Sequence, residues 1–523
     1  MNHPKYSRRD FVRGGACMVA AGAASSFLPK LNLMGEALAQ SGTGTGYKAL
    51  VCVYLGGGND SWNLLIPTGT NASGQFSHAE YVAARNGLYS GTNTGGLAVP
   101  RVTTSGALPP ALALNNTSGN LGVNPFAPEL AALYNSNRLS FIANVGTVSD
   151  PITRATFNNR KKPPQLFSHN DQTSLWQIGS GNNLQITQGF GGQIAGVTAQ
   201  NNLVGLSSAI SIAGQTRFLV GETLSGAPVF PFQMSTSTTT PAPLLNNYNA
   251  GSSTQGEPQR RGALNQLFNL AYPELYSLEY RDIFNRSLQM AAVVNAEMAA
   301  NGTINTTFPA NNSLADQLRQ VARMIKISRP ASVGGPGAIA ANRQVYYVNL
   351  GGFDTHDSQI TSTSQAQGHH LLLQRLSQAV NAFNSAMVEI GAANEVTLFT
   401  MSDFARTLNS NGNGTDHAWG SVQFVMGGGV SGGQVKGRYP RIVLDLQGDN
   451  NGESFSRGQF LPTTASDQLA ATLARWMGVD DANLPAIFPN IDNFASGPFA
   501  NAAATPTFAH FNRVIPGLLA GVS

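Results

Sequence analysis

Cysteine is nearly absent from this chain. Only Cys17 and Cys52 occur among 523 residues. Cys17 precedes Ala39, where we expect the N-terminal segment to be cleaved, so the remaining chain would hold one cysteine and no internal disulfide. Cys52 lies inside the apolar run from Ala49 to Leu55, where a thiol is expected to pack as a small core side chain and not to act as a nucleophile.

Charge is also scarce, at 11% of the residues against the roughly 25% that is typical of soluble domains. The formal net charge of +4 arises largely within residues 1–39, which hold five cationic residues and two acidic ones. The rest of the chain is close to neutral and contains no basic patch, which argues against a nucleic-acid partner. With 42% hydrophobic residues the chain can still bury a core.

Long hydrophobic runs are missing, since no stretch reaches the roughly 20 apolar residues of a membrane-spanning helix. The apolar stretch from Ala16 to Leu28 is shorter, and it follows the twin-arginine pattern Ser7-Arg8-Arg9-Asp10-Phe11-Val12. Ala37-Leu38-Ala39 offers a cleavage site. We predict a signal peptide over 1–39 and a linker over 40–46. The twin-arginine translocase would then export the folded chain, a route that favours a bound metal or cofactor, to a periplasmic or secreted location.

Apolar runs with strand-like length recur between helical patterns. Strands are expected at Ala49–Leu55, Leu139–Gly146, Val345–Leu350, Val396–Met401 and Gln423–Met426, and helices within 261–300 and 313–327 and at Gly368–Ile390 and Ser466–Met477. The strand–helix–strand order around Gly368–Ile390 predicts a parallel βαβ unit and an α/β fold. We expect a single α/β domain over 47–523 with long polar loops, because 200–260 lacks periodicity, and with an insertion around 180–330.

Carboxylates and imidazoles follow these strands at their carboxyl ends, where α/β folds assemble their sites. Asp354 and His356 come directly after one strand and, as residues i and i+2 of an extended loop, share a face. Asp403 follows the next strand, and His417 lies in the loop beyond it. Asp60 follows the first strand in a glycine-rich turn. Such oxygen and nitrogen ligands suit one or two divalent ions, namely zinc, manganese, calcium or magnesium.

Three further side chains complete the predicted chemistry. Arg406 is suited to an oxyanion through its bidentate fork. Ser168 is the candidate nucleophile and Thr173 the reserve, because a hydroxyl can be activated by a metal.

The alternative is that the carboxylates and imidazoles pair only among themselves as buried polar contacts. His369 and His370 are expected to begin a helix and not to share a metal.

These segments resemble the family labelled domain of unknown function 1501. The resemblance covers roughly 46–520 and includes the twin-arginine signal, Gly57-Gly58-Asn59-Asp60, Asp354-Thr355-His356, Ser402-Asp403-Phe404-Ala405-Arg406-Thr407 and Thr415-Asp416-His417-Ala418. The family looks like a branch of the alkaline phosphatase-like and sulfatase superfamily. That likeness implies a doubly wound α/β core, a site for one or two metals and a Ser or Thr nucleophile.

Carried over by position, the resemblance places Asp60, Asp354, His356, Asp403 and His417 among the metal ligands. It departs from active phosphatases at Phe404, where they commonly have a histidine, and from the family at Asp403 and Ala405, where Glu and Gly are common. We therefore expect an exported, metal-dependent hydrolase of phosphate or sulfate esters. The alternatives are a non-catalytic envelope protein with a degenerate site, or a carbohydrate- or surface-polymer-binding protein that uses the Asn/Gly/Thr-rich loops. An open groove lined by Trp62, Trp176 and Trp419 would support the last of these.

Overall fold

The computed structural model describes residues 46–199, 202, 206–242, 256–444, 454–455, 457–495 and 512–522. The predicted signal peptide with Cys17, and the linker up to residue 45, lie outside the described residues. Within the described ranges, no helix combines the length and the apolar composition needed to cross a membrane.

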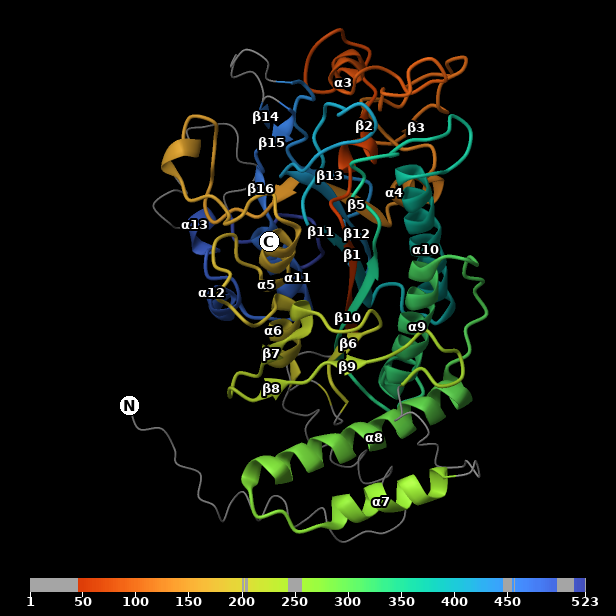
Figure 1. Ribbon diagram of the computed structural model, residues 1–523, viewed down its shortest axis with the longest axis vertical. Coiled ribbons are helices and arrows are strands. Elements are labelled where there is room, and N and C mark those ends of the chain that lie inside the picture. Colours follow the sequence, from red (N-terminus) through yellow and green to blue (C-terminus); the bar gives the residue numbers. More distant parts are fainter. Residues whose placement is uncertain are drawn as a thin grey trace.

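A nine-stranded sheet forms the centre of the molecule (Figure 1). Its strands are β1 (Lys48–Leu55), β5 (Leu139–Gly146), β6 (Ala209–Ser211), β9 (Phe232–Gln233), β10 (Arg343–Leu350), β11 (Val396–Ser402), β12 (Ser421–Gly427), β13 (Val435–Gly437) and β16 (Thr464–Ala465). The order is β13-β5-β12-β11-β1-β10-β6-β9, and β16 also pairs with β5. Only β12 runs antiparallel to its neighbours, β11 and β5, so the sheet is mostly parallel.

Helices cover both faces of this sheet (Figure 1). One face carries α4 (Pro128–Asn135), α9 (Ser313–Ser328) and α10 (His369–Glu389), and the other carries α5 (His169–Ile178), α6 (Phe190–Val197) and α11 (Ser466–Met477). Alternate residues of β1 enter the two cores, Val51 and Val53 on the first side and Leu50 and Cys52 on the second. The predicted α/β architecture with a mostly parallel, helix-flanked sheet is confirmed, as is the buried position of Cys52.

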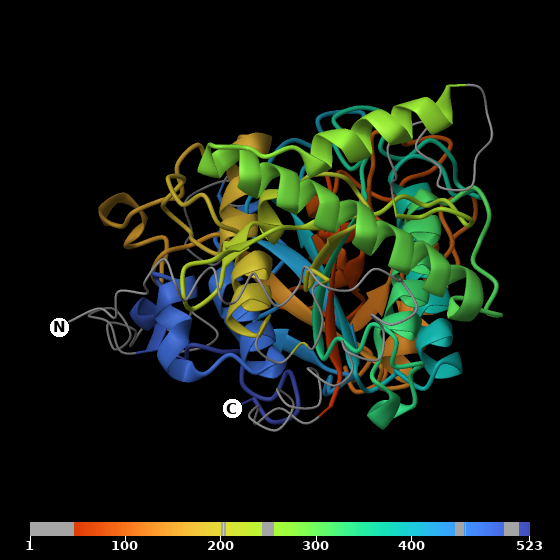
Figure 2. The same cartoon turned by 90° about the horizontal axis from the view of Figure 1, so that it is seen from below.

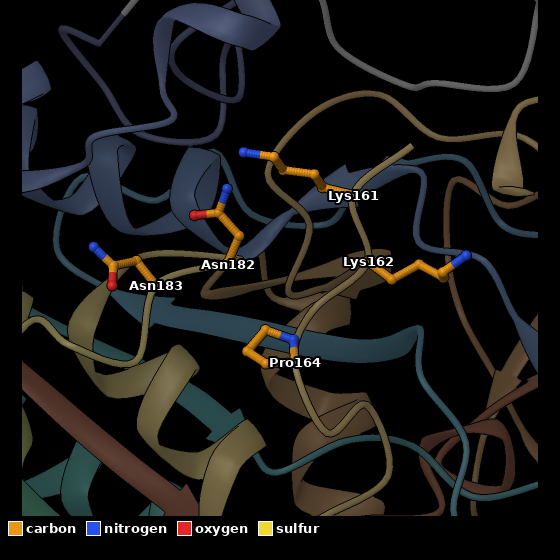
Figure 3. Close-up of a pocket in the computed structure, with 5 residues that line it drawn as sticks. All are labelled: Lys161, Lys162, Pro164, Asn182 and Asn183. Atoms are coloured by element: carbon orange, nitrogen blue, oxygen red, sulfur yellow. The ribbon is translucent and has the colours of Figure 1, made fainter. Parts of the chain in front are cut away.

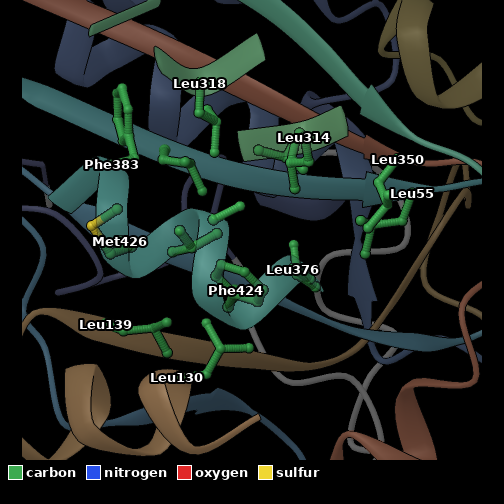
Figure 4. Packing of buried hydrophobic residues seen from close by; sticks show 14 of the residues in the cluster. Leu55, Leu130, Leu139, Leu314, Leu318, Leu350, Leu376, Phe383, Phe424 and Met426 are labelled. Carbon is green, nitrogen blue, oxygen red and sulfur yellow. The ribbon is translucent and has the colours of Figure 1, made fainter. Parts of the chain in front are cut away.

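The larger core lies between the sheet and the helices α9, α10 and α4 (Figure 4). Leu314 and Leu318 of α9 and Leu376 and Phe383 of α10 are fully buried there. Burying one such side chain stabilises the fold by about 1.5–3 kcal/mol. The amphipathic pattern of α9 and α10 therefore fixes both helices on the sheet and, with them, the loops at the carboxyl ends of the strands.

The predicted strand–helix–strand unit is present as β10, α10 and β11, but β1 lies between the two strands. The strand expected at Gln423–Met426 is β12, and it runs antiparallel. The segment 200–260, expected to be loops, contributes β6 and β9, which extend the sheet at one edge. These strands span only three and two residues, too few for a periodic pattern to appear in the sequence.

The remaining elements lie around this core. α7 (Glu257–Asn269) and α8 (Leu275–Asn301) cross one end of the molecule (Figures 1 and 2). The others are α3 (His78–Ala84), β2 (Leu65–Pro67), β3 (Leu112–Ala113), β4 (Leu121–Val123), β7 (Gly221–Glu222), β8 (Pro228–Val229), β14 (Ser454–Phe455), β15 (Gln459–Phe460), α12 (Leu484–Ile487), α13 (Asp492–Ala495), and short 3-10 turns at Ser61–Asn63, Phe157–Asn159, Arg217–Leu219, Ala331–Val333 and Asp481–Asn483. The division into domains stays a prediction.

Candidate metal centre

A glycine turn after β1 brings the motif segments together. Gly57 and Gly58 have φ angles of 114° and 81°, in the region that favours glycine. A Cβ at Gly57 would lie 2.4 Å from the Asp354 amide nitrogen, and one at Gly58 would lie 2.5 Å from the Phe404 ring. Only glycine at both positions lets this turn pack against the segments that follow β10 and β11, where the parallel strands end.

Asp354 occupies the centre of a histidine cluster. Its Oδ1 atom lies 3.2 Å from Nε2 of His356 and 3.7 Å from Nε2 of His417, and its Oδ2 atom lies 3.6 Å from Nε2 of His169. One ligand atom each from His169, Asp354 and His417 lie within 4.8 Å of one another. The Asp354 side chain is half exposed, so the cluster is open to solvent.

The Nδ1 atom of each of the three imidazoles lies at hydrogen-bond distance from an oxygen acceptor. Nδ1 of His417 lies 2.7 Å from the Phe167 carbonyl oxygen, and Nδ1 of His169 lies 2.7 Å from Oδ2 of Asp403. Nδ1 of His356 lies 3.1 Å from Oδ1 of Asp416. Because a carbonyl or an ionised carboxylate can only accept, each Nδ1 is the donor, and the neutral ring carries its free lone pair on Nε2.

The unprotonated Nε2 atoms therefore point at Asp354 and at one another. Nε2 of His356 and Nε2 of His417 are 2.8 Å apart, too close for two lone pairs without a proton or a cation between them. Nε2 of His169 is buried and has no hydrogen-bond partner among the described residues. Three imidazole nitrogens and a carboxylate, with oxygen acceptors behind the rings, are the arrangement that metal-binding histidines adopt. The residues present fit a divalent metal.

The electrostatics differ among the members of the cluster, favouring the unprotonated form of Asp354 and His417 but not of His169. Burial raises the pKa of Asp354, but the hydrogen bond and charge of Arg406 outweigh burial and hold the pKa below its usual value. Burial lowers the pKa of His417, and only the bond to the Phe167 carbonyl acts in the opposite direction among nearby groups. The hydrogen bond to Asp403 raises the pKa of His169. Metal binding at His169 therefore competes with protonation.

Two predicted site residues, Asp403 and Arg406, each form a hydrogen bond with a member of the cluster. Asp403 is buried, accepts hydrogen bonds from the Tyr54 hydroxyl and the Gly57 amide, and holds His169. Arg406 is fully buried and donates to Asp354 and to three backbone carbonyls, those of Gly57, Gly58 and Thr415. In this position Asp403 orients a ligand, and Arg406 orients Asp354.

Asp60 lies outside the cluster, although the sequence placed it among the ligands. It is fully buried and forms an ion pair with Arg85, whose side chain is also fully buried. Gln359 donates to Asp60 at 2.5 Å and accepts a hydrogen bond from Thr415 at 2.6 Å. Arg85 also donates to the carbonyls of Thr407 and Leu408. Asp60 therefore joins the segments after β1, β10 and β11 beneath the cluster.

The two candidate nucleophiles differ in their surroundings. Ser168 precedes α5 directly, between Phe167, whose carbonyl holds His417, and His169. Thr173 lies one turn into α5, and its hydroxyl is 2.5 Å from that of Tyr54, which in turn binds Asp403. Thr173 thus belongs to the hydrogen-bonded support of His169, and Ser168 directly precedes His169 in the chain.

Other histidines and the tryptophans lie away from this chemistry. His369 and His370 begin α10, as expected, and burial lowers the pKa of each to about 3. Trp62, Trp176 and Trp419 are all buried, so they line no open groove. This burial counts against the polymer-binding alternative in the form in which the sequence suggested it.

His169 is the member of the cluster that sequence reasoning missed. Its carboxylate partner, Asp403, is 234 residues away, so no spacing links the two. The available signal was the position of His169 at the start of a helix directly after Phe167-Ser168. Asp416 was visible beside His417 in the sequence, but its bond to His356 spans 60 residues.

The chain is similar to one described protein family over about half of its length. The model of the family described as "Protein of unknown function (DUF1501)" matches residues 230–487. The resemblance to this family is confirmed. The matched range contains Asp354, His356, Asp403, Arg406 and His417, whereas Asp60 and His169 precede it. No curated protein matches the chain.

Several solved structures also match. Ps i-CgsB in complex with k-i-k-neocarrahexaose aligns with 87% of this chain and 79% of its own, at 11% identity and a TM-score of 0.31. The C-terminal periplasmic domain of EcEptC from Escherichia coli aligns over 86% and 88%, at 9% identity and a TM-score of 0.32. BT1596, a 2-O GAG sulfatase, aligns over 85% and 74%, at 11% identity and a TM-score of 0.27. Such distant similarities add nothing to the fold described above.

Proposed function

We propose that the protein is an exported, metal-dependent hydrolase of phosphate or sulfate esters. The observation that carries the proposal is the convergence of three imidazole Nε2 atoms on the Asp354 carboxylate, with every Nδ1 held by an oxygen acceptor. Side chains that only paired with one another would present a donor to each acceptor. Here the Nε2 atoms of His356 and His417 meet at 2.8 Å, and Nε2 of His169 has no hydrogen-bond partner among the described residues.

In this proposal His169, His417 and Asp354 hold the ion, with His356 beside them. A set rich in imidazole favours zinc over manganese, calcium or magnesium, which prefer oxygen ligands. When bound, the metal lowers the pKa of a coordinated water or hydroxyl and neutralises charge on an ester oxygen. Asp403, predicted as a ligand, positions His169, and Arg406, predicted for the oxyanion, positions Asp354. Ser168 remains the proposed nucleophile.

The test begins with elemental analysis of the purified mature protein. We expect a stoichiometric divalent metal in the native chain, with zinc the preferred ion, and its loss from an Asp354→Ala/His417→Ala variant. Asp357→Ala is the matched control, because Asp357 lies on the same loop, is exposed and contacts Ser358 and Asn413 instead of the cluster. Release of nitrophenol from p-nitrophenyl phosphate and p-nitrophenyl sulfate then measures hydrolysis.

Each result has a defined meaning. No metal in the native protein, and none taken up on addition, would refute the metal-dependent hydrolase. Stoichiometric metal with no hydrolysis of either ester would favour the alternative, a non-catalytic envelope protein with a metal-binding scaffold. If Ser168→Ala still hydrolyses the esters, the nucleophile is a metal-activated water and not the Ser168 hydroxyl.

The proposed export rests on the sequence pattern at Arg8 and Arg9. In a bacterial host with the twin-arginine translocase, Arg8→Lys/Arg9→Lys should leave an uncleaved chain in the cytoplasm, whereas the native chain should appear cleaved in the periplasm. Immunoblots of cell fractions measure both. Equal export of the two chains would contradict the twin-arginine route.

A further inference from the structure

A polar pocket without charged residues lies away from the metal cluster. It is formed by the turn between β3 and β4, the end of α4, the segment that leads into β13, and Phe76. Its volume is about 680 Å³, enough for a small ligand or one part of a larger one. The parallel strands β5 and β13 begin beside this pocket, whereas β10 and β11 end at the cluster, so the two places lie at opposite ends of the strands.

The lining of the pocket offers amides and no charge. None of the described residues that line it is acidic or basic, and the side-chain amides of Asn120, Asn137 and Gln434 form no hydrogen bond with another described residue. Each amide can both donate and accept. A charged ligand would find no counter-charge here, and a wholly apolar one would remove the amides from water without replacing their hydrogen bonds. An uncharged ligand with several hydroxyl groups fits the lining.

Tyr134 adds a buried hydroxyl to this lining. The residue is only 1% exposed, and its hydroxyl has no hydrogen-bond partner within the described ranges. Burial raises the pKa of Tyr134, so the hydroxyl stays protonated and can donate as well as accept. Buried hydroxyls usually have a partner in the protein or in a bound molecule. A hydroxyl of a ligand in the pocket would supply one.

An aromatic ring forms one wall of the pocket. Phe76 is partly exposed, and its ring stacks on that of Tyr439, with the ring centroids 5.9 Å apart and the planes 29° from parallel. The Tyr439 hydroxyl donates to the Leu65 carbonyl at 2.8 Å, which holds the pair in place. The face of an aromatic ring is electron-rich and apolar, so it packs against the C–H groups on one face of a sugar ring.

Close backbone contacts fix the shape of the pocket. A Cβ at Gly432 would lie 2.2 Å from the Asn137 carbonyl carbon, and one at Gly433 would lie 2.3 Å from Oδ1 of Asn137. The Gly433 amide donates to the Leu139 carbonyl at 2.9 Å, and Nδ2 of Asn116 donates to the Gly433 carbonyl at 3.4 Å. Because these contacts exist before a ligand arrives, binding does not have to order the walls.

We propose that this pocket binds a neutral oligosaccharide, with one sugar face on Phe76 and sugar hydroxyls bonded to Tyr134 and to the amides of Asn120, Asn137 and Gln434. The inference does not rest on the proposed hydrolase function, because the pocket is lined by none of the residues of the cluster. A charged polymer would have to give up its hydration in a lining that offers no opposite charge.

The test is affinity electrophoresis of the full chain through gels that contain dextran, starch, galactomannan or xylan. At least one of these neutral polysaccharides should retard the native chain, and Tyr134→Phe should weaken that binding about fivefold, the scale of one neutral hydrogen bond. Urea unfolding should show no loss of stability in Tyr134→Phe, since the hydroxyl has no partner among the described residues. Tyr89→Phe is the control, because Tyr89 is also buried and does not line the pocket.

A second pair of variants tests the amides. Asn120→Ala/Gln434→Ala should weaken binding at least as much as Tyr134→Phe does. Asn182→Ala/Asn183→Ala is the matched control, because it also removes one partly exposed and one exposed amide. The control amides line a different hollow at the surface, which is formed by Lys161, Lys162, Pro164, Asn182 and Asn183 (Figure 3).

The outcomes distinguish this inference from the proposed function. Retardation by none of the polysaccharides, equal retardation of Tyr134→Phe and the native chain, or an equal loss in either control would overturn it. Loss of binding in about 1 M sodium chloride would indicate a charged ligand, and equal binding of an uncharged Ser/Asn-rich peptide would indicate a polypeptide ligand. Chelator-treated protein should bind as the native chain does, so absent metal or absent hydrolysis would refute only the proposed function.

Discussion

The three histidines of the cluster differ in the acceptor that holds each Nδ1 atom. His417 is bound to a backbone carbonyl, His356 to the carboxylate of Asp416, which also pairs with Arg457, and His169 to Asp403. Of the two carboxylates, Asp403 is more buried than Asp416. Its single bond to His169 therefore decides the tautomer of that ring with little competition from water.

Exchange of Asp403 for asparagine tests this role. If the amide turns its nitrogen toward Nδ1 of His169, the ring must accept there and carry its proton on Nε2, which faces Asp354. We expect Asp403→Asn to lower metal affinity about 10- to 100-fold, as loss of such supporting carboxylates does elsewhere. Competition with a chromogenic chelator measures this affinity without any assay of activity.

Asp171→Asn is the matched control for that experiment. Asp171 lies in the first turn of the same helix, α5, and is not among the described residues that form the group His169, Asp354 and His417. The control should bind metal as the native chain does. Unchanged affinity in Asp403→Asn, with the fold intact, would remove Asp403 from the support of the site.

At the scale of elements, sequence periodicity predicted those that bury a continuous apolar face. β5 and α11 begin and end at the expected residues, and β1 begins one residue earlier. The site was only partly predictable, since Asp354, His356 and His417 are brought together as expected while His169 joins them across 185 residues or more. Contacts made only by tertiary packing leave no periodic signal in the sequence.

Asp60 is the opposite case, because the sequence predicted it as a ligand and the structure places it outside the cluster. A carboxylate in a glycine turn after a buried strand matches the pattern of a ligand, but its partner, Arg85, closes the carboxyl end of α3. The ion pair lies wholly within the protein, so each charge depends on the other. Together with Gln359 it connects the loops after β1, β10 and β11.

We therefore expect Asp60→Asn to change stability and not metal binding. The variant leaves the Arg85 guanidinium buried without a counter-charge, which costs about 3–5 kcal/mol. Urea unfolding should show this loss, while elemental analysis of the folded fraction should find as much metal as in the native chain. Asp60→Asn/Arg85→Met should regain part of the stability, because the uncompensated charge is removed. Metal lost from the folded Asp60→Asn protein would make Asp60 a ligand after all.

At the scale of the whole molecule, one buried acid influences how stability varies with pH. Asp467 lies in the first turn of α11 and is fully buried, and its Oδ2 atom has no hydrogen-bond partner in the part of the chain that the structure describes. Burial raises the pKa of Asp467 to about 7, although the Ser466 hydroxyl and other donors act in the opposite direction. The folded state therefore keeps a proton that the unfolded chain releases near its ordinary pKa of 3.8.

The sign of the effect follows from which state binds the proton. Below pH 3.8 both states are protonated, and Asp467 costs nothing. Between pH 3.8 and 7 the folded state binds more protons than the unfolded one, so stability falls as pH rises, by up to roughly 4 kcal/mol. Above pH 7 both states are ionised, and the loss levels off.

Asp467→Asn should remove this dependence, since an amide stays neutral throughout. Relative to the native chain, the variant should gain stability steadily from pH 4 to pH 7 and no further above it, as measured by urea unfolding at each pH. Asp480→Asn, at an exposed position just beyond α11, should track the native chain at every pH. The comparison cancels the contributions of other carboxyl groups, so a constant difference between Asp467→Asn and the native chain would mean that Asp467 is already ionised in the folded protein.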